Sequence, residues 1–99
     1  MTDDAADASI GALRRTLPIG NKRGLHARAA AKFVRTVGQF DAAVRVSFKG
    51  QEVSGLSIMG LMMLAAGIGS AVELTCSGRQ ATEAMTALSA LVEGKFGEE

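Results

Sequence analysis

The chain contains a single histidine, His26, within the stretch RGLHARAAAKFV, which runs from Arg23 to Val34. Gly24 lies two residues before it, Arg28 lies two residues after it, and an apolar periodic segment begins at once. This spacing predicts an imidazole at the N-cap of a helix, where backbone N–H groups lack intrahelical acceptors and the helix dipole is positive. Such a position attracts anions, and phosphate is a typical occupant. The sequence therefore indicates a site that could hold or transfer a phosphoryl group.

The residue types around this helix start fit that chemistry. Histidine caps helices poorly, so the first turn lacks its usual side-chain acceptor, and phosphoryl oxygens on the imidazole would supply one. Arg28 adds a permanent positive charge whose N–H groups suit phosphate oxygens. The same charges disfavour the imidazolium form, which leaves a ring nitrogen of His26 free to attack phosphorus. On these residues alone, a polar loop histidine beside a solvated arginine is an equally good interpretation.

Other site chemistries find less support. A metal site needs several Cys, His or carboxylate ligands at suitable spacing, and one histidine with one cysteine supplies too few. Cys76 falls on the apolar face of an expected strand, where a thiol is normally inert packing, so a Cys–His nucleophilic pair is disfavoured. We therefore expect neither a metal nor a cofactor.

Length and composition limit the class of protein. The 99 residues are 47% apolar and 21% charged, as in one ordinary globular domain. A net charge of +1 and the absence of Trp and Tyr argue against nucleic-acid binding. A small nucleic-acid binder that places Arg28, Lys32 and Arg35 on phosphates is a weaker alternative. One cysteine, no signal peptide and no apolar run of spanning length favour a cytoplasmic protein without membrane insertion.

The elements that must position His26 follow from the hydropathy pattern. Residues 1–12 are small, acidic and unpatterned, and we expect a disordered extension there, ahead of one domain over residues 13–99. Within the domain the pattern predicts the order β-α-β-β-α-β-α. The expected segments are 14–19, 26–38, 42–48, 51–54, 57–65, 71–76 and 81–92. Amphipathic helices and half-buried strands in this order favour an α+β fold, with one sheet and its helices on a single face.

Two motifs together resemble a known family. GLHARAAAKFV, followed at a fixed distance by SGLSIMGLMMLAAGIGS, is similar to HPr, the histidine-containing phosphocarrier of the bacterial phosphoenolpyruvate-dependent phosphotransferase system. The resemblance spans about residues 14–96. It implies the HPr-like open-faced β-sandwich, whose four-stranded antiparallel sheet has the order 1-4-2-3 and makes the strand with Pro18 an edge. Ala29 stands where the family usually has proline, which is favourable but dispensable in a first helical turn.

The resemblance also implies a role for each site residue. His26 would accept a phosphoryl group on Nδ1 from phospho-Enzyme I and pass it to a histidine of an enzyme IIA-type protein, in the sugar-uptake or the nitrogen-regulatory branch. Arg28 would stabilise the phosphoryl group. Such a protein is a monomeric phosphocarrier, and not an enzyme that turns over a substrate.

The resemblance implies a regulatory and a docking surface as well. Ser57 aligns with the serine that HPr kinase/phosphorylase modifies in many bacteria, although as a residue it need only be the N-cap of the second helix. The residues expected to bind partners are Leu25, Lys32, Ile58, Met59 and Met62. Flexible methionine suits a surface that serves several partners. The competing hypothesis is a regulatory interaction module of the same fold that does not rely on histidine phosphorylation.

Overall fold

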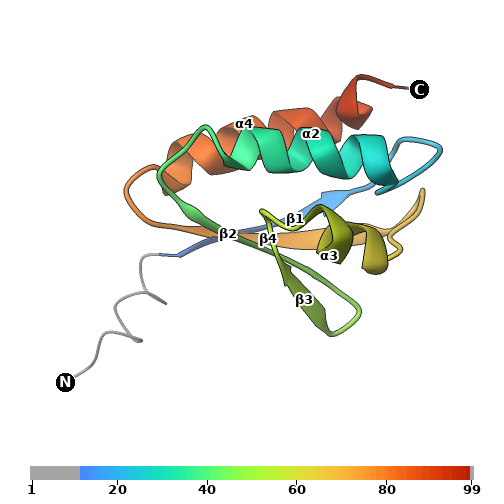
Figure 1. The fold of residues 1–99 in the computed structure, drawn as a ribbon, viewed down its shortest axis with the longest axis horizontal. Helices are drawn as coiled ribbons and strands as arrows, with labels where there is room; N and C mark the ends of the chain where they lie inside the picture. The colour runs from blue at the N-terminus through green and yellow to red at the C-terminus, as the bar shows by residue number, and fades with distance from the viewer. Residues whose placement is uncertain (1–11, 99) are drawn as a thin grey trace.

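A computed structural model describes residues 12–98, which form one four-stranded antiparallel sheet with helices packed against it (Figure 1). The elements are β1 (Leu13–Pro18), α2 (Ala27–Val37), β2 (Ala43–Phe48), β3 (Gln51–Ser54), α3 (Ile58–Met63), β4 (Ala71–Ser77) and α4 (Ala81–Glu93), followed by the short 3₁₀ turn η1 (Lys95–Gly97). The predicted order β-α-β-β-α-β-α is confirmed. The expected extension over residues 1–12 lies outside the described residues, apart from Ala12.

The strand order is β1-β4-β2-β3, as the family resemblance implied. Leu17 on β1 lies opposite Val72 on β4, and Val46 on β2 lies opposite Leu74 on β4. All four side chains are buried, because alternate residues of a strand point to the same face of its sheet. The edge strand β1 ends at Pro18, whose missing N–H is tolerated there.

The hairpin between β2 and β3 turns at Lys49 and Gly50, as predicted. Both residues have positive φ angles, 50° and 81°, which is the geometry of a two-residue type I′ turn. This turn matches the twist of the flanking strands and brings Phe48 opposite Gln51. The turn and the register of the hairpin therefore follow from local residues.

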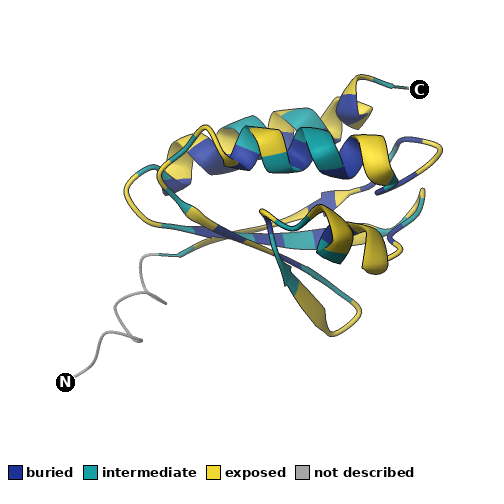
Figure 2. Ribbon diagram, viewed as in Figure 1, coloured by how far each residue is buried: buried dark blue, intermediate teal, exposed yellow. Residues whose placement is uncertain are grey.

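Helices α2 and α4 lie side by side and antiparallel on one face of the sheet (Figure 1). Their inward faces are buried and their outward faces are exposed (Figure 2). Phe33 on α2 and Leu88 on α4 are among the most buried side chains. Because the helices are antiparallel, the end of α4 reaches the beginning of α2, and Phe96 of η1 is buried there with 1% of its surface exposed. The segment after α4 thus lies beside the start of α2.

Helix α3 is half core and half surface. Leu61 and Leu64 are buried, whereas the remaining apolar side chains of the helix are exposed. Ser57 is its N-cap, as predicted, and the Ser57 hydroxyl accepts a hydrogen bond of 2.9 Å from the backbone N–H of Gly60. The helix packs against α2 and β3, which leaves one apolar face without a covering element in residues 12–98.

Candidate functional site

His26 is the N-cap of α2, as the sequence predicted. Its backbone is extended, with φ of −79° and ψ of 178°, and its side chain makes no capping hydrogen bond. Its carbonyl accepts the first helical hydrogen bond, 2.9 Å from the N–H of Ala30. The N–H groups of the residues between them, in the first turn, have no acceptor in the helix. An anion attached to the ring would meet both these donors and the positive end of the helix dipole.

The loop before His26 is held by Gly24, whose φ of +64° is in the left-handed region. The Gly24 carbonyl accepts from the His26 N–H at 2.9 Å and from Asn21 Nδ2 at 2.8 Å. The next N–H, that of Leu25, donates to the carbonyl of Ala66 at 3.0 Å. This last bond ties the histidine loop to the segment that follows α3, so the two sequence motifs meet in space.

One ring nitrogen of His26, Nε2, is hydrogen-bonded to a carboxylate that the sequence did not reveal. Nε2 lies 2.9 Å from Glu98 Oε1 and 3.0 Å from Glu98 Oε2. Asn21, which is fully buried, donates its side-chain N–H to Glu98 Oε1 at 3.0 Å. The hydrogen bonds from His26 and Asn21 hold the pKa of Glu98 below its ordinary value. The carboxylate is therefore charged at neutral pH and acts only as an acceptor.

Basic side chains line a hollow together with Glu98, the carboxylate that contacts His26. A hollow of about 240 Å³, here called the basic hollow, is lined by Lys22, Arg23, Arg28 and Glu98. Lys22, Arg23 and Arg28 are exposed, so their charges face solvent and any group that enters the hollow. Arg28, the residue predicted to stabilise the phosphoryl group, thus lies two residues from His26 in the chain. It lines the basic hollow together with Glu98, the hydrogen-bond partner of His26.

Lys32 has a different environment from the other basic residues. Its Nζ donates to the carbonyl of Phe96 at 2.7 Å, which links α2 to η1. Leu25 is also inside the fold, with 6% of its surface exposed. Both residues were predicted to bind partners; the structure leaves little of Leu25 for a partner to touch and gives the Lys32 ammonium an internal acceptor. A role in partner binding for either residue stays a prediction.

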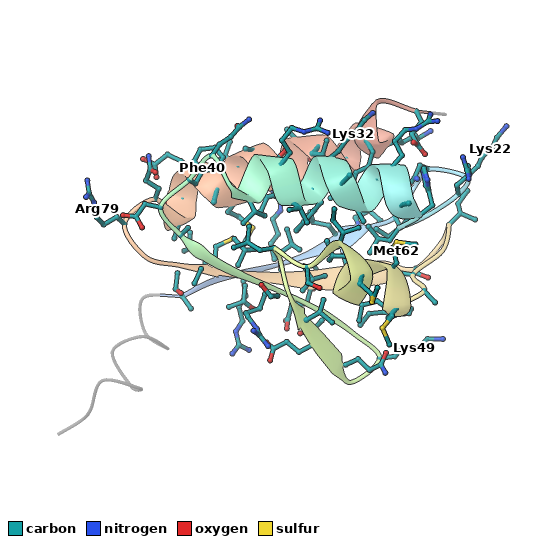
Figure 3. The ribbon with its side chains drawn as sticks, viewed as in Figure 1. Lys22, Lys32, Phe40, Lys49, Met62 and Arg79 are labelled. Atoms are coloured by element: carbon teal, nitrogen blue, oxygen red, sulfur yellow. The ribbon has the colours of Figure 1, made fainter. Side chains whose placement is uncertain are left out.

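An exposed apolar surface lies on α3. The methionine patch, defined by Ile58, Met59, Met62 and Met63, lines an open hollow of about 530 Å³. Met59 and Met63 each expose 72% of their surface, which is far more than core methionines show. Met62 and Lys22 lie toward the same end of the molecule, at the start of α2 (Figure 3). The predicted docking residues Ile58, Met59 and Met62 are therefore together and accessible; that they bind partners stays a prediction.

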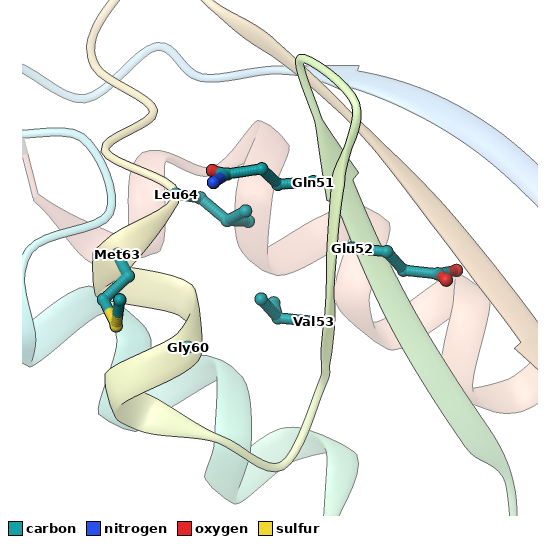
Figure 4. A pocket seen from close by; sticks show the side chains of 6 residues that line it. All are labelled: Gln51, Glu52, Val53, Gly60, Met63 and Leu64. Carbon is teal, nitrogen blue, oxygen red and sulfur yellow. The ribbon is translucent and has the colours of Figure 1, made fainter.

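Other candidate centres have no features of a site. A hollow of about 310 Å³ lies between β3 and α3, where Val53 and Leu64 face each other (Figure 4), and its lining has no hydroxyl, thiol, imidazole or basic side chain. Cys76 is buried, and its burial raises the pKa of the thiol. Within residues 12–98, no three His, Cys, Asp or Glu side chains lie close enough to hold a metal ion. No helix in that range is long and apolar enough to cross a membrane.

Comparison with known protein families gives one consistent result. The family model described as "PTS HPr component phosphorylation site" matches residues 13–94. The phosphocarrier protein HPr of Cupriavidus necator is 52% identical over 86 residues, which cover 87% of this chain and 97% of that protein. The phosphocarrier protein NPr of Shewanella violacea is 41% identical over 86 residues, which cover 87% of this chain and 94% of that protein.

The fold is similar to solved structures as well. The crystal structure of HPr-C-His from Thermoanaerobacter tengcongensis matches with a TM-score of 0.84 and 44% sequence identity. The match covers 88% of this chain and 98% of that one. Sequence and fold thus point to the same group of proteins over nearly the whole described chain.

Proposed function

Because the chain belongs to the HPr family, the phosphocarrier proteins of the bacterial phosphotransferase system, we propose that His26 Nδ1 accepts a phosphoryl group from phospho-Enzyme I and passes it to a histidine of an enzyme IIA-type protein. The observation that carries this proposal is the position of the only histidine: it is the uncapped N-cap of α2, beside the basic hollow. A phosphocarrier needs a nucleophile that is accessible to a protein donor and surrounded by groups that stabilise a phosphoryl dianion.

The chemistry divides between the ring and its surroundings. Nδ1 of His26 attacks phosphorus in line with the donor nitrogen, and the phosphoryl oxygens then meet the first-turn N–H groups and the Arg28 guanidinium. The backbone N–H groups are fixed by the helix before transfer, so they stabilise charge without reorganisation. Because onward transfer must also be fast, the site stabilises the phosphoryl group only moderately, through exposed charges that water screens.

The methionine patch is proposed as the surface on which Enzyme I and the IIA-type acceptor dock in turn. Its support is its exposure and its position on α3, beside α2 and the histidine loop. The basic residues at the same end of the molecule favour acidic partner surfaces and would accelerate encounters at low ionic strength. Such a relay operates in the cytoplasm, in either the sugar-uptake or the nitrogen-regulatory branch.

Ser57 is proposed as a second modification site, for a kinase of the HPr kinase/phosphorylase type. Its hydroxyl caps α3, where the helix dipole tolerates a phosphate, but the next two residues, Ile58 and Met59, belong to the methionine patch. A dianion there would have to be desolvated when a partner docks. Replacing Ser57 with Asp should therefore slow phosphoryl transfer from Enzyme I, and equal rates for the wild type and the variant would contradict this role.

The relay can be reconstituted with labelled phosphoenolpyruvate, Enzyme I, this chain and a set of IIA-type proteins. We expect label on a IIA-type protein only when the chain is present, and no transfer through His26→Ala. Comparing sugar-specific with nitrogen-regulatory IIA-type acceptors identifies the branch. Label that reaches the acceptor equally well through His26→Ala would contradict the proposed function and favour the interaction-module hypothesis.

A further inference from the structure

The carboxylate of Glu98 contacts the ring nitrogen of His26 that the proposed phosphoryl transfer does not use. The Nε2 atom lies 2.9 Å and 3.0 Å from the two carboxylate oxygens, and the two side chains are largely buried, with 13% and 20% of their surfaces exposed. Glu98 is 72 residues away in the chain and reaches the ring only because α4 ends beside the start of α2 (Figure 1). The contact therefore depends on the whole fold.

One further hydrogen bond holds the carboxylate, and two contacts anchor the turn before it. Asn21 is fully buried, and its Nδ2 donates both to Glu98 Oε1 and to the Gly24 carbonyl. Because both partners are acceptors, the amide nitrogen of Asn21, and not its oxygen, must face them. The preceding turn is anchored by the buried Phe96 ring and by the hydrogen bond from Lys32 Nζ to the Phe96 carbonyl. Besides His26, Glu98 is thus held by Asn21 and by the anchored turn that precedes it.

This geometry determines which nitrogen of His26 carries a proton. A charged carboxylate only accepts hydrogen bonds, so Nε2 must donate, and in the neutral imidazole the lone pair is then on Nδ1. We propose that Glu98 is a positioning residue that holds His26 in the Nε2–H tautomer, directs phosphoryl transfer to Nδ1, and stabilises the ring cation that transfer creates. This inference rests on the proposed function for its transfer step, but its tautomer claim concerns the free protein.

Glu98 neither gains nor loses a proton in the proposed transfer step. The Nδ1 lone pair of neutral His26 forms the new N–P bond while the donor N–P bond breaks, and that electron pair returns to the donor nitrogen. The His26 ring now bears Nδ1–P and Nε2–H and is formally a cation, which the carboxylate stabilises as in a carboxylate–histidine pair. In onward transfer the ring leaves as neutral imidazole. If Nε2 lost its proton first, the leaving group would be the much poorer imidazolate.

The charged groups around Glu98 and His26 determine the pH range in which Glu98 is ionised. Lys22, Arg23 and Arg28 line the hollow with Glu98, and Lys32 adds a favourable Coulomb interaction with the carboxylate. The hydrogen bonds from His26 and Asn21 and the charge of Lys32 lower the pKa of Glu98, so the acceptor stays charged through the neutral and alkaline range. Retention of the Nε2 proton should therefore extend transfer from the phosphorylated protein to higher pH in the wild type than in a variant without the carboxylate.

The first test uses the unphosphorylated full chain and no partner. Ring ¹⁵N chemical shifts of His26 should report a single Nε2–H tautomer in the wild type, a mixture in Glu98→Ala, and retained preference in Glu98→Gln, whose amide oxygen can still accept. The matched control is Glu93→Gln, because Glu93 pairs with exposed Arg15 and not with His26. Equal tautomer populations in the wild type and Glu98→Ala would overturn the proposal, provided that backbone spectra show the same fold.

The second test measures phosphorylation by phosphoramidate, a small phosphoryl donor that needs no protein partner. We expect Glu98→Ala to lower the rate about threefold to tenfold, less than the ~10⁴-fold loss on altering the buried carboxylate of a Ser-His-Asp triad, because Glu98 is partly hydrated. The phosphorylation rate of Glu98→Gln should fall between those of the wild type and Glu98→Ala, and Glu93→Gln should match the wild type. Glu98→Ala should also carry some phosphate on Nε2, and its onward transfer should be lost at a lower pH than in the wild type. Unchanged rate, attachment site and pH profile in Glu98→Ala would overturn the inference, whereas a wild type that active Enzyme I never phosphorylates would refute the proposed function instead.

Discussion

The substitution Gly24→Ala offers the sharpest test of how the fold positions His26. A Cβ on Gly24 would overlap the Ala66 carbonyl oxygen and would lie 2.7 Å from the Gly67 Cα, and both are backbone atoms that cannot swing aside. The residue also has a φ of +64°, which costs a non-glycine residue about 1–2 kcal/mol. Relief of the overlap must move the segment after α3 and weaken the hydrogen bond from Leu25 to Ala66, worth about 1 kcal/mol.

Together these contributions predict a loss of about 3 kcal/mol in the free energy of unfolding for Gly24→Ala. For a domain of this size, that loss lowers the melting temperature by roughly 12–24 °C. Gly50→Ala is the matched control, because Gly50 has a φ of +81° but nothing within 4 Å of the added Cβ. It should cost only the conformational penalty of about 1–2 kcal/mol.

Urea unfolding of the wild type and both variants measures the difference, and phosphorylation by Enzyme I measures its effect on the site. Gly24→Ala should be phosphorylated more slowly than Gly50→Ala under conditions in which both are folded, because only the first displaces the loop that carries His26. Equal stability of the two variants would refute the reasoning, since it would mean that the close approach of the loop to Ala66 does not constrain the fold.

Three smaller predictions follow from single contacts. Ser57→Ala removes the acceptor for the Gly60 N–H and should lower the free energy of unfolding by about 1 kcal/mol, measured by urea titration, whereas no change would mean that the cap does not stabilise α3. The Cys76 thiol, whose pKa burial raises, should react with a disulfide reagent only as fast as the protein opens; rapid reaction of the folded protein would contradict its burial. The hydrogen bond from His26 lowers the pKa of Glu98 in the folded protein below its ordinary value of 4.5. The contact therefore stabilises the fold above the pKa of the unfolded state, and this stabilisation is lost as the pH falls through the lower pKa of the folded state. NMR should detect the contact still intact at pH 4.5, and its loss by that pH would contradict the shift.

Local patterns predicted most of the secondary structure. Alternation of apolar residues located β2 and β4, and the 3.6-residue repeat located α2 and α4, because these periods follow directly from backbone geometry. The Lys49–Gly50 turn followed from turn chemistry. The strand order β1-β4-β2-β3 did not follow from any period; it came from the family resemblance, since pairing between distant strands leaves little trace in either sequence.

The candidate site was predicted only where it is local. His26, Arg28 and the cap at Ser57 lie at their own helix starts, so neighbouring residues predicted their positions, whereas the roles of His26 and Arg28 came from the family resemblance. Glu98 was missed because its position depends on the antiparallel packing of α2 and α4. It also depends on the turn at Phe96, whose φ of 55° is uncommon for a residue other than glycine and could not be expected from its type.

Lys32 shows a related limit of sequence interpretation. On the helical pattern it belongs to a basic face, and the family resemblance implied a contact with acidic partners. Its acceptor, the Phe96 carbonyl, lies 64 residues away and is a backbone atom, so no side-chain type in the sequence could mark it. Residues whose partners are backbone groups of distant turns are therefore the ones that sequence patterns assign least well.

Intact mass gives the most direct test of the claim that His26 carries a phosphoryl group. The wild type and His26→Ala are each incubated with phosphoenolpyruvate and an Enzyme I that is shown to be active on another HPr. We predict that the wild type gains the mass of one phosphoryl group, that acid removes it, and that His26→Ala gains nothing. No gain by the wild type with that Enzyme I, or with one from the same source as the chain, would contradict the claim, as would an equal gain by His26→Ala.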